Sequence, residues 1–226
     1  MDTLTNDILQ WDVRSWAKAL RFWESRVRWD RMAAGLELGG RAGGLSLWMA
    51  KGGLQVVCSD LENTAATAGP LHARRGVSPQ ITYRDIDATN IPYEDHFDLI
   101  AFKSIIGGIG RDGHIERQRA VFAQIHKALK PGGMLVFAEN LAASPFHRLF
   151  RRLFVRWGAS WRYVTMDEMR GFLAPFSSHE LGATGVLATF GRSEGQRQAL
   201  ARVDQALLNH VTPQGWKYIV YGVAVK

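Results

Sequence analysis

Short apolar segments that alternate with helical patterns constrain the fold of this 226-residue chain more than any other feature. The apolar segments lie at 36–38, 55–59, 81–84, 97–102 and 134–138. Strands that alternate with helices are typical of a mostly parallel sheet with helices on both faces. The sequence therefore predicts a doubly wound α/β fold.

The two ends of the chain have mainly helical patterns. Residues 8–32 carry apolar side chains at helical spacing, which predicts one or two helices, and 117–130 predicts a helix ended by Pro131. Capping boxes at Thr165 and Ser193 open further helices, and 216–225 alternates like a closing strand. We expect one domain, with a helical cap (1–32), a core (33–140), a helical lid (141–175) and final strands and a helix (176–226).

Composition limits the class of protein but does not choose a partner. With 28 Lys and Arg against 21 Asp and Glu, the net charge of +7 suits nucleic acid, an anionic membrane or an acidic substrate. The single cysteine, Cys58, permits no intrachain disulfide and no cysteine-rich zinc site. The first residues lack the pattern of a secretory signal, and no apolar run approaches membrane-spanning length. We expect a cytoplasmic protein.

A glycine-rich turn follows the first predicted strand at 39–44. Glycines there let the backbone approach a ligand and turn directly into a helix. Glu37 stands just before the turn, and Asp60 ends the second strand, where a carboxylate can accept both hydroxyls of a ribose. A dinucleotide fingerprint would need a second glycine where this chain has Arg41, which disfavours a nicotinamide dehydrogenase.

The turn resembles that of class I S-adenosylmethionine-dependent methyltransferases, acid-x-G-x-G-x-G. Residues 87–93 resemble the family's Asp-Ala segment after strand three, 97–100 its fourth strand, and 129–133 its turn into strand five. The resemblance covers about 33–140 in the family's order and implies a seven-stranded sheet, with the final strands near 178–188 and 217–225.

The resemblance also implies roles for matched residues. Glu37 would anchor the loop or the amino group of S-adenosylmethionine, and Asp60 with Leu61 would hold its ribose. Asp87 and Ala88 would hold the adenine, and Lys103 would lie near the methyl group. The methionine and ribose portion would lie along Gly39, Gly40, Arg41 and Gly43.

Arg41 departs from the family pattern, because it replaces the middle glycine. Its guanidinium could pair with the carboxylate of the cofactor, point to solvent, or mark a site that no longer binds.

A base assists an oxygen nucleophile in giving up its proton, and the candidates are Glu139, His114 and His147. No metal is expected, because Lys103 rather than an acid follows strand four. The motif for methylating a planar amide is missing after strand four, and Cys58, inside strand two, is misplaced for cytosine-C5 chemistry.

Residues 146–157 form an amphipathic stretch without acids. It predicts a lid helix, a site for an anionic acceptor or membrane surface, or a contact with nucleic acid. Segments 102–110, 144–148 and 161–163 are similar to bacterial methyltransferases associated with surface polysaccharide. The apolar face carries Phe146, Leu149, Phe150, Leu153, Phe154 and Trp157, and the polar face His147, Arg148, Arg151, Arg152 and Arg156.

The sequence thus predicts S-adenosylmethionine-dependent O-methylation of a small-molecule or glycan hydroxyl. The acceptor is the expected partner, with peripheral contact to the anionic inner membrane through 146–157 as a further hypothesis. The alternatives are an RNA methyltransferase, which a basic cleft would favour, and a non-catalytic cofactor-binding partner subunit. The sequence does not decide the oligomeric state.

Overall fold

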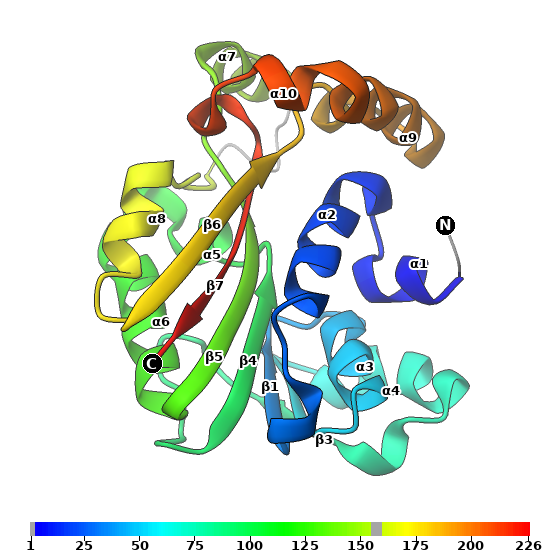
Figure 1. Cartoon of the computed structure of the whole chain (residues 1–226), viewed down its shortest axis with the longest axis vertical. Helices are drawn as coiled ribbons and strands as arrows, with labels where there is room; N and C mark the ends of the chain where they lie inside the picture. Colours follow the sequence, from blue (N-terminus) through cyan, green and yellow to red (C-terminus); the bar gives the residue numbers. More distant parts are fainter. Residues whose placement is uncertain (1–2, 155–159) are drawn as a thin grey trace.

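One seven-stranded sheet forms the centre of the molecule (Figure 1). The structure, a computed structural model, describes residues 3–154 and 160–226. The strand order is β3-β2-β1-β4-β5-β7-β6; β1 to β5 pair in parallel, and β7 runs antiparallel to β5 and β6. The predicted doubly wound fold is confirmed. The strands are β1 (Ala34–Leu38), β2 (Gln55–Asp60), β3 (Ile81–Asp85), β4 (Phe97–Lys103), β5 (Leu129–Asn140), β6 (Ser178–Thr184) and β7 (Ile219–Val225).

Helices cover both faces of the sheet. α1, α2, α3 and α4 pack on one face and α5, α6 and α8 on the other, while α7, α9 and α10 gather beyond the carboxyl ends of the parallel strands (Figure 1). Their bounds are α1 (Thr3–Leu9), α2 (Val13–Glu24), α3 (Gly44–Lys51), α4 (Thr64–Arg75), α5 (Ile106–Ile109), α6 (Ile115–Ala128), α7 (Pro145–Phe154), α8 (Met166–Phe172), α9 (Glu194–Val203) and α10 (Asn209–Val211).

The central strands are apolar on both faces, because each face is covered by helices. In β4, Leu99 and Ala101 join the cluster with the N-terminal helices, whereas Ile100 and Phe102 join the cluster with α6 and α8. All four side chains are completely buried. The sheet is therefore a rigid platform that fixes the positions of the loops at its carboxyl edge.

The order of the sheet reverses between β1 and β4. From β1 the chain continues outward to β2 and β3, and from β4 it continues to β5 in the opposite direction. Ligands of doubly wound sheets bind beyond the carboxyl ends of the strands at such a point. The loops after β1 and β4 are thus the expected ligand-binding loops.

Several predicted boundaries were wrong. The helix expected to reach Lys130 ends at Ala128, because Leu129 is already extended and pairs with Phe97 in the sheet. A proline disfavours helical backbone at the residue before it, which is Lys130 here. The helix therefore has to end before Lys130 and not at Pro131. The strand expected over 178–188 stops at Thr184. The helix that opens after Ser193 continues only to Val203, where a π-helical turn at Asp204–Leu208 follows.

The basic stretch 146–157 forms α7 up to Phe154, and the rest of that prediction lies outside the described residues. The two helices of the expected lid, 141–175, lie in different parts of the structure. α7 lies beyond the strand ends, whereas α8 packs into the core through Met169 and Phe172.

Substituting Phe122→Ala should lower the free energy of unfolding by about 3–5 kcal/mol. The buried Phe122 ring contacts Phe102, Phe137 and Phe172, so its removal leaves a cavity between α6 and the sheet. Urea unfolding measures the loss, with Leu207→Ala, at a 56% exposed side chain, as the matched control within about 0.5 kcal/mol of the parent. Equal losses in the two variants would contradict this packing.

Candidate functional site

The loop after β1 needs its glycines for steric reasons. Gly39 and Gly43 have φ values of +62° and +76°, which side chains disfavour. A Cβ atom on Gly39 would lie 2.4 Å from Ile105 Cγ2, and one on Gly40 would lie 2.9 Å from the Glu37 carboxyl carbon. The loop therefore keeps its backbone close to the strand ends, open to a ligand.

Glu37 holds this loop from inside the protein. Its carboxylate accepts the backbone N–H groups of Leu45 (3.0 Å) and Ser46 (2.7 Å) in the first turn of α3. Burial raises the pKa of Glu37 to about 7, opposed by the hydrogen bonds from Ser46 and Leu45. Glu37 thus occupies the loop-anchoring position expected from the sequence, and it is 3% exposed.

Arg41 occupies the position where the family pattern has glycine. It is exposed and left-handed, with φ +49°, and its backbone N–H donates to Asp60 Oδ2 at 2.8 Å. Its positive charge helps to lower the pKa of Lys103. The backbone tolerates arginine here, and the role of its side chain toward a cofactor stays a prediction.

Asp60, Leu61, Asp87 and Ala88 lie at the ends of β2 and β3, as expected. Each Asp60 oxygen accepts one backbone N–H, from Arg41 or Leu61, which leaves acceptor capacity for ribose hydroxyls. The Asp87 pKa is lowered chiefly by the Thr89 N–H, which keeps this exposed acid ionised. Leu61 is 67% exposed beside these acids, an apolar surface that a nucleoside could cover.

This donor set fits an adenosyl ligand. Two carboxylates at neighbouring strand ends match the hydroxyls and amino group of adenosine, and the glycine loop brings its backbone close to the same edge of the sheet. Its contacts with Gly39, Gly40, Arg41, Gly43 and Ala88 remain predictions.

Lys103 ends β4 but turns toward the N-terminal segment. Its Nζ donates to the Leu9 carbonyl at 2.5 Å and lies 4.5 Å from the ring centroid of Trp11 and 4.9 Å from that of Trp16. Burial lowers the pKa of Lys103 to about 7, against the attraction of Asp12. Lys103 therefore ties the cap to the end of β4; its nearness to a bound methyl group is untested.

Of the three base candidates from the sequence, two are buried and hydrogen-bonded within the protein and one is exposed. Glu139 is fully buried and accepts the N–H groups of Ile106 (2.7 Å) and Asn140 (2.8 Å). His147 is 2% exposed, with Nδ1 2.6 Å from Ser144 Oγ and Nε2 2.7 Å from the Val186 carbonyl. His114 is exposed and precedes α6. None of the three lines the cavity described next.

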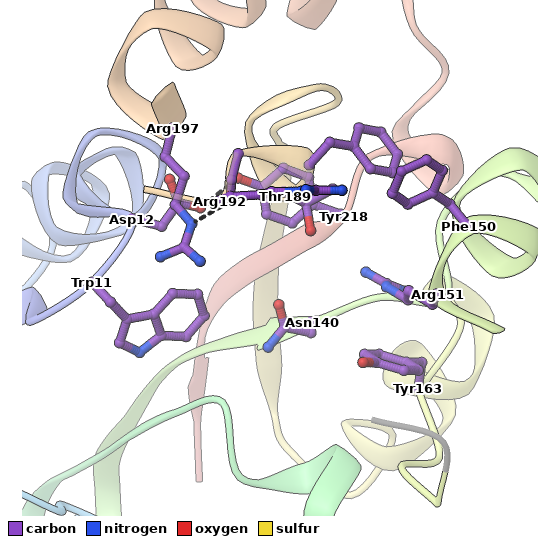
Figure 2. Close-up of a pocket in the computed structure, with 12 residues that line it drawn as sticks. Trp11, Asp12, Asn140, Phe150, Arg151, Tyr163, Thr189, Arg192, Arg197 and Tyr218 are labelled. Atoms are coloured by element: carbon purple, nitrogen blue, oxygen red, sulfur yellow. Dashed lines mark hydrogen bonds between the residues drawn. The ribbon is translucent and has the colours of Figure 1, made fainter. Parts of the chain in front are cut away.

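A cavity of about 410 Å³ lies beyond the end of β5 (Figure 2). Its aromatic lining comes from distant segments: Trp11 from the α1–α2 link, Phe150 from α7, and Tyr218 from the start of β7. Tyr163 and Phe190 complete this lining. The α1–α2 link, α7 and the start of the last strand thus meet around a partly open pocket at the end of β5, where an acceptor could bind.

Asp12 is the acid of this cavity that the sequence did not reveal. An acid before a helix is ordinarily a cap, but Asp12 makes no capping hydrogen bond, and Glu194 instead accepts the N–H groups of Asp12 and Val13 at 3.0 Å each. Tyr218, 206 residues away, donates its hydroxyl to Asp12 Oδ2 at 2.5 Å. Neither partner gives a local sequence signal.

Comparison with known proteins agrees with this geometry. Residues 36–137, a little under half of the chain, match the model of the methyltransferase domain family. These residues form a domain of the methyltransferase family. No curated protein sequence matches the chain.

Solved structures share the fold at low identity. Phosphoethanolamine N-methyltransferase 2 of Haemonchus contortus, in complex with phosphomonomethylethanolamine and S-adenosylhomocysteine, has a TM-score of 0.64 and 19% identity over 93% of this chain and 52% of that chain. This chain thus spans about half the length of that relative. The N-methyltransferase NodS of Bradyrhizobium japonicum WM9, with S-adenosylhomocysteine, has a TM-score of 0.60 and 18% identity, covering 93% and 84% of the two chains.

A third structure separates the fold from the reaction. The cyclase SpnF has a TM-score of 0.57 and 16% identity over 86% of this chain and 74% of its own. One fold hosts several chemistries, so the reaction must be argued from the site. Among the described residues, no group of three or more His, Cys, Asp and Glu side chains could hold a metal ion.

Replacing Lys103 by methionine should change how stability depends on pH. The pKa of Lys103 is about 7 when folded and near 10.5 when unfolded, so the unfolded chain binds more protons between these values. The parent should therefore gain about 1–2 kcal/mol of unfolding free energy relative to Lys103→Met between pH 7 and 9. Urea unfolding at both pH values measures this, with the exposed Lys51→Met as control. A difference that is the same at both pH values would contradict the burial of this amine.

Proposed function

We propose that the protein transfers a methyl group from S-adenosylmethionine to a hydroxyl oxygen of a small molecule or glycan. The observation that carries this proposal is the cavity of about 410 Å³ that the α1–α2 link and α7 line at the end of β5. A pocket of this size suits one small group better than a polymer strand.

The chain's residues would position and protect the reactants. Asp60 and Asp87 would hold the nucleoside, and the loop anchored by Glu37 would approach the amino acid portion. When bound, S-adenosylmethionine supplies a methyl group on a positively charged sulfur, which is already a good leaving group. The protein's main contributions are then alignment and exclusion of water.

Two alternatives remain distinct from this proposal. An RNA methyltransferase would need a long basic cleft past the cofactor loop, whereas the cavity is a pocket of about 410 Å³ with Trp11, Phe150 and Phe190 in its lining. A non-catalytic partner subunit would bind cofactor but support no transfer to any acceptor. Two of the similar solved structures are N-methyltransferases, so an acceptor screen should also include amines.

Calorimetric titration with S-adenosylmethionine, S-adenosylhomocysteine and NADH tests the cofactor site. We expect micromolar binding of the two adenosyl ligands, no binding of NADH, and a loss of about 100-fold or more in Asp60→Ala, because ribose hydroxyls would lose a charged acceptor. Asp167→Asn, at an exposed acid of α8, is the matched control and should bind like the parent.

Failure of both adenosyl ligands to bind would overturn the cofactor assignment for this chain. Binding that survives in Asp60→Ala would keep the cofactor but remove the proposed role of Asp60.

We also propose a cytoplasmic protein that contacts the anionic inner membrane through α7. Phe146 and Leu149 are 62% and 56% exposed on this helix, beside the exposed Arg148. Apolar side chains flanked by arginine suit the surface of an anionic bilayer. In the described parts of the chain no helix is both long and apolar enough to cross a membrane.

Flotation with vesicles containing phosphatidylglycerol tests this contact. The parent should float at low salt and much less at 0.5 M salt, and Phe146→Ser combined with Leu149→Ser should abolish flotation. Val203→Ser, at an exposed apolar residue of α9, serves as the control. A parent that stays unbound at low salt would end the membrane hypothesis.

A further inference from the structure

The cavity beyond β5 is lined by more positive than negative side chains. Arg151, Arg192 and Arg197 line it, and Asp12 is its one acid among the described lining residues. Figure 2 shows Arg151 and Arg197 entering from opposite sides of the space above Asn140. Excess positive charge in a small enclosed space favours a negatively charged ligand.

Arg151 is the most constrained of these arginines. Its Nη1 donates to the carbonyls of Leu141 (2.7 Å) and Ala142 (3.3 Å), and its guanidinium carbon lies 4.0 Å from the ring centroid of Tyr163. Burial lowers its pKa, and the described residues place no carboxylate against it. A buried cation without a counter-ion is costly, and an anionic ligand would remove that cost.

The other two arginines differ in their existing partners. Arg197 donates to the Gly191 carbonyl at 3.1 Å and lies 3.9 Å from Glu194, so part of its charge is already balanced. Arg192 is exposed at the cavity edge, and no ion pair to its side chain occurs in the described chain. Arg151 and Arg192 are therefore the pair with charge left to offer a ligand.

Asp12 offers the opposite chemistry at the same cavity. It is 2% exposed, and Oδ2 accepts the Tyr218 hydroxyl, whereas Oδ1 makes no hydrogen bond of good geometry with a described residue, although the Ser15 hydroxyl is close enough to lower the Asp12 pKa. An unsatisfied buried carboxylate oxygen costs free energy unless a ligand donates to it. A hydroxyl group would be such a donor.

The floor of the cavity joins the cofactor side of the sheet. Asn140 donates from Nδ2 to Ser104 Oγ at 2.6 Å, and Ser104 directly follows β4. Trp11 in turn contacts Lys103, the last residue of β4. A ligand on this floor would lie next to the loops expected to hold the cofactor.

We propose that the acceptor is a small, flat molecule that carries an anionic group and a hydroxyl. Arg151 and Arg192 bind the anionic group, the aromatic walls hold the flat body, and Asp12 accepts the proton of the hydroxyl. This inference rests on the proposed methyl transfer and names the class of acceptor.

Methyl transfer to the acceptor moves one proton and one electron pair. The acceptor oxygen forms a bond to the methyl carbon while its proton passes to the Asp12 carboxylate. The bond between that carbon and the donor sulfur breaks, and its electron pair stays on sulfur and neutralises its positive charge. Asp12 later releases the proton to water, so no oxidant or metal is needed.

Calorimetry with simple aromatic probes tests the anion site without any turnover. The probes are the three hydroxybenzoates, benzoate, phenyl phosphate, 4-hydroxybenzyl alcohol and tyramine. We expect the anions to bind at least about 10-fold more tightly than the neutral alcohol or the amine, since charge-assisted hydrogen bonds are the strong ones. Carboxylate and phosphate probes distinguish which anion the site prefers.

Arginine variants connect this binding to the cavity. Arg192→Gln and Arg151→Gln should each weaken anion binding about 10-fold and leave the neutral alcohol unchanged. Arg192 is at the surface, so its variant remains informative if Arg151→Gln fails to fold. Arg202→Gln, at an exposed arginine on α9, is the matched control and should bind like the parent.

Equal binding of neutral, cationic and anionic probes would overturn the proposal. So would a loss in Arg202→Gln as large as that in Arg192→Gln, because the effect would then reflect overall charge.

The role of Asp12 has its own measurement. The best-binding hydroxybenzoate should outbind benzoate several-fold above pH 6, and the preference should shrink below it as Asp12 protonates. Burial raises the pKa of Asp12 to about 6. The charged and titratable groups around it are Tyr218, Glu194, Arg197 and Lys103, with Ser15 close enough to lower its pKa.

In Asp12→Asn the preference for the hydroxyl should be independent of pH, and Tyr218→Phe, a milder change to the same pair, should shift its midpoint. Thermal denaturation checks that both variants fold. A preference that follows pH identically in the parent and both variants would exclude Asp12.

The two proposals fail in different ways. If S-adenosylhomocysteine binds but no anion does, the acceptor inference alone fails. If the anions bind through Arg192 but no adenosyl ligand does, the anion site stands and the cofactor assignment fails.

Discussion

The buried carboxylate of Glu37 is the interaction on which the cofactor half of the molecule depends. It bonds to the first turn of α3, while the Glu37 backbone carbonyl accepts the Ser59 hydroxyl at 2.6 Å. The Ser59 carbonyl in turn accepts the Gly40 N–H at 2.8 Å. One residue thus joins β1, the glycine loop, α3 and β2. The loop can leave its remaining polar groups open to a ligand because these contacts already fix its path.

The half of the molecule around the cavity depends on contacts between residues that are far apart in the sequence. Asp12 meets Tyr218, Glu194 meets the start of α2, and Lys103 meets the Leu9 carbonyl. These contacts hold the cap over the strand ends through polar groups that are largely buried. A hydrogen bond between such groups is strong, and either group left unpaired would be costly. The shape of the cavity is therefore coupled to the charge states of Asp12 and Lys103.

This difference explains what the sequence could predict. The strands, their order and the positions of Glu37, Asp60 and Asp87 follow from apolar runs and a local motif, because each signal lies within a few residues. Asp12 and Tyr218 meet across 206 positions, and nothing near either residue marks the encounter. Glu139 looked like a base because it ends a strand at the ligand edge. The structure shows the reason an acid is needed there: it accepts the N–H of Ile106 at the start of α5.

The residues that match the methyltransferase family and the residues that line the cavity come from different parts of the chain. The matched region, 36–137, ends before Asn140 and contains none of the three arginines or Asp12. A cofactor site built from consecutive strand ends can stay fixed while the added segments vary, since the residues that form it lie within the matched region. The aromatic walls, the arginines and Asp12 all come from those added segments, apart from Asn140 at the end of β5. If the acceptor binds in this cavity as proposed, its choice is encoded by the parts of the chain that lie outside the matched region.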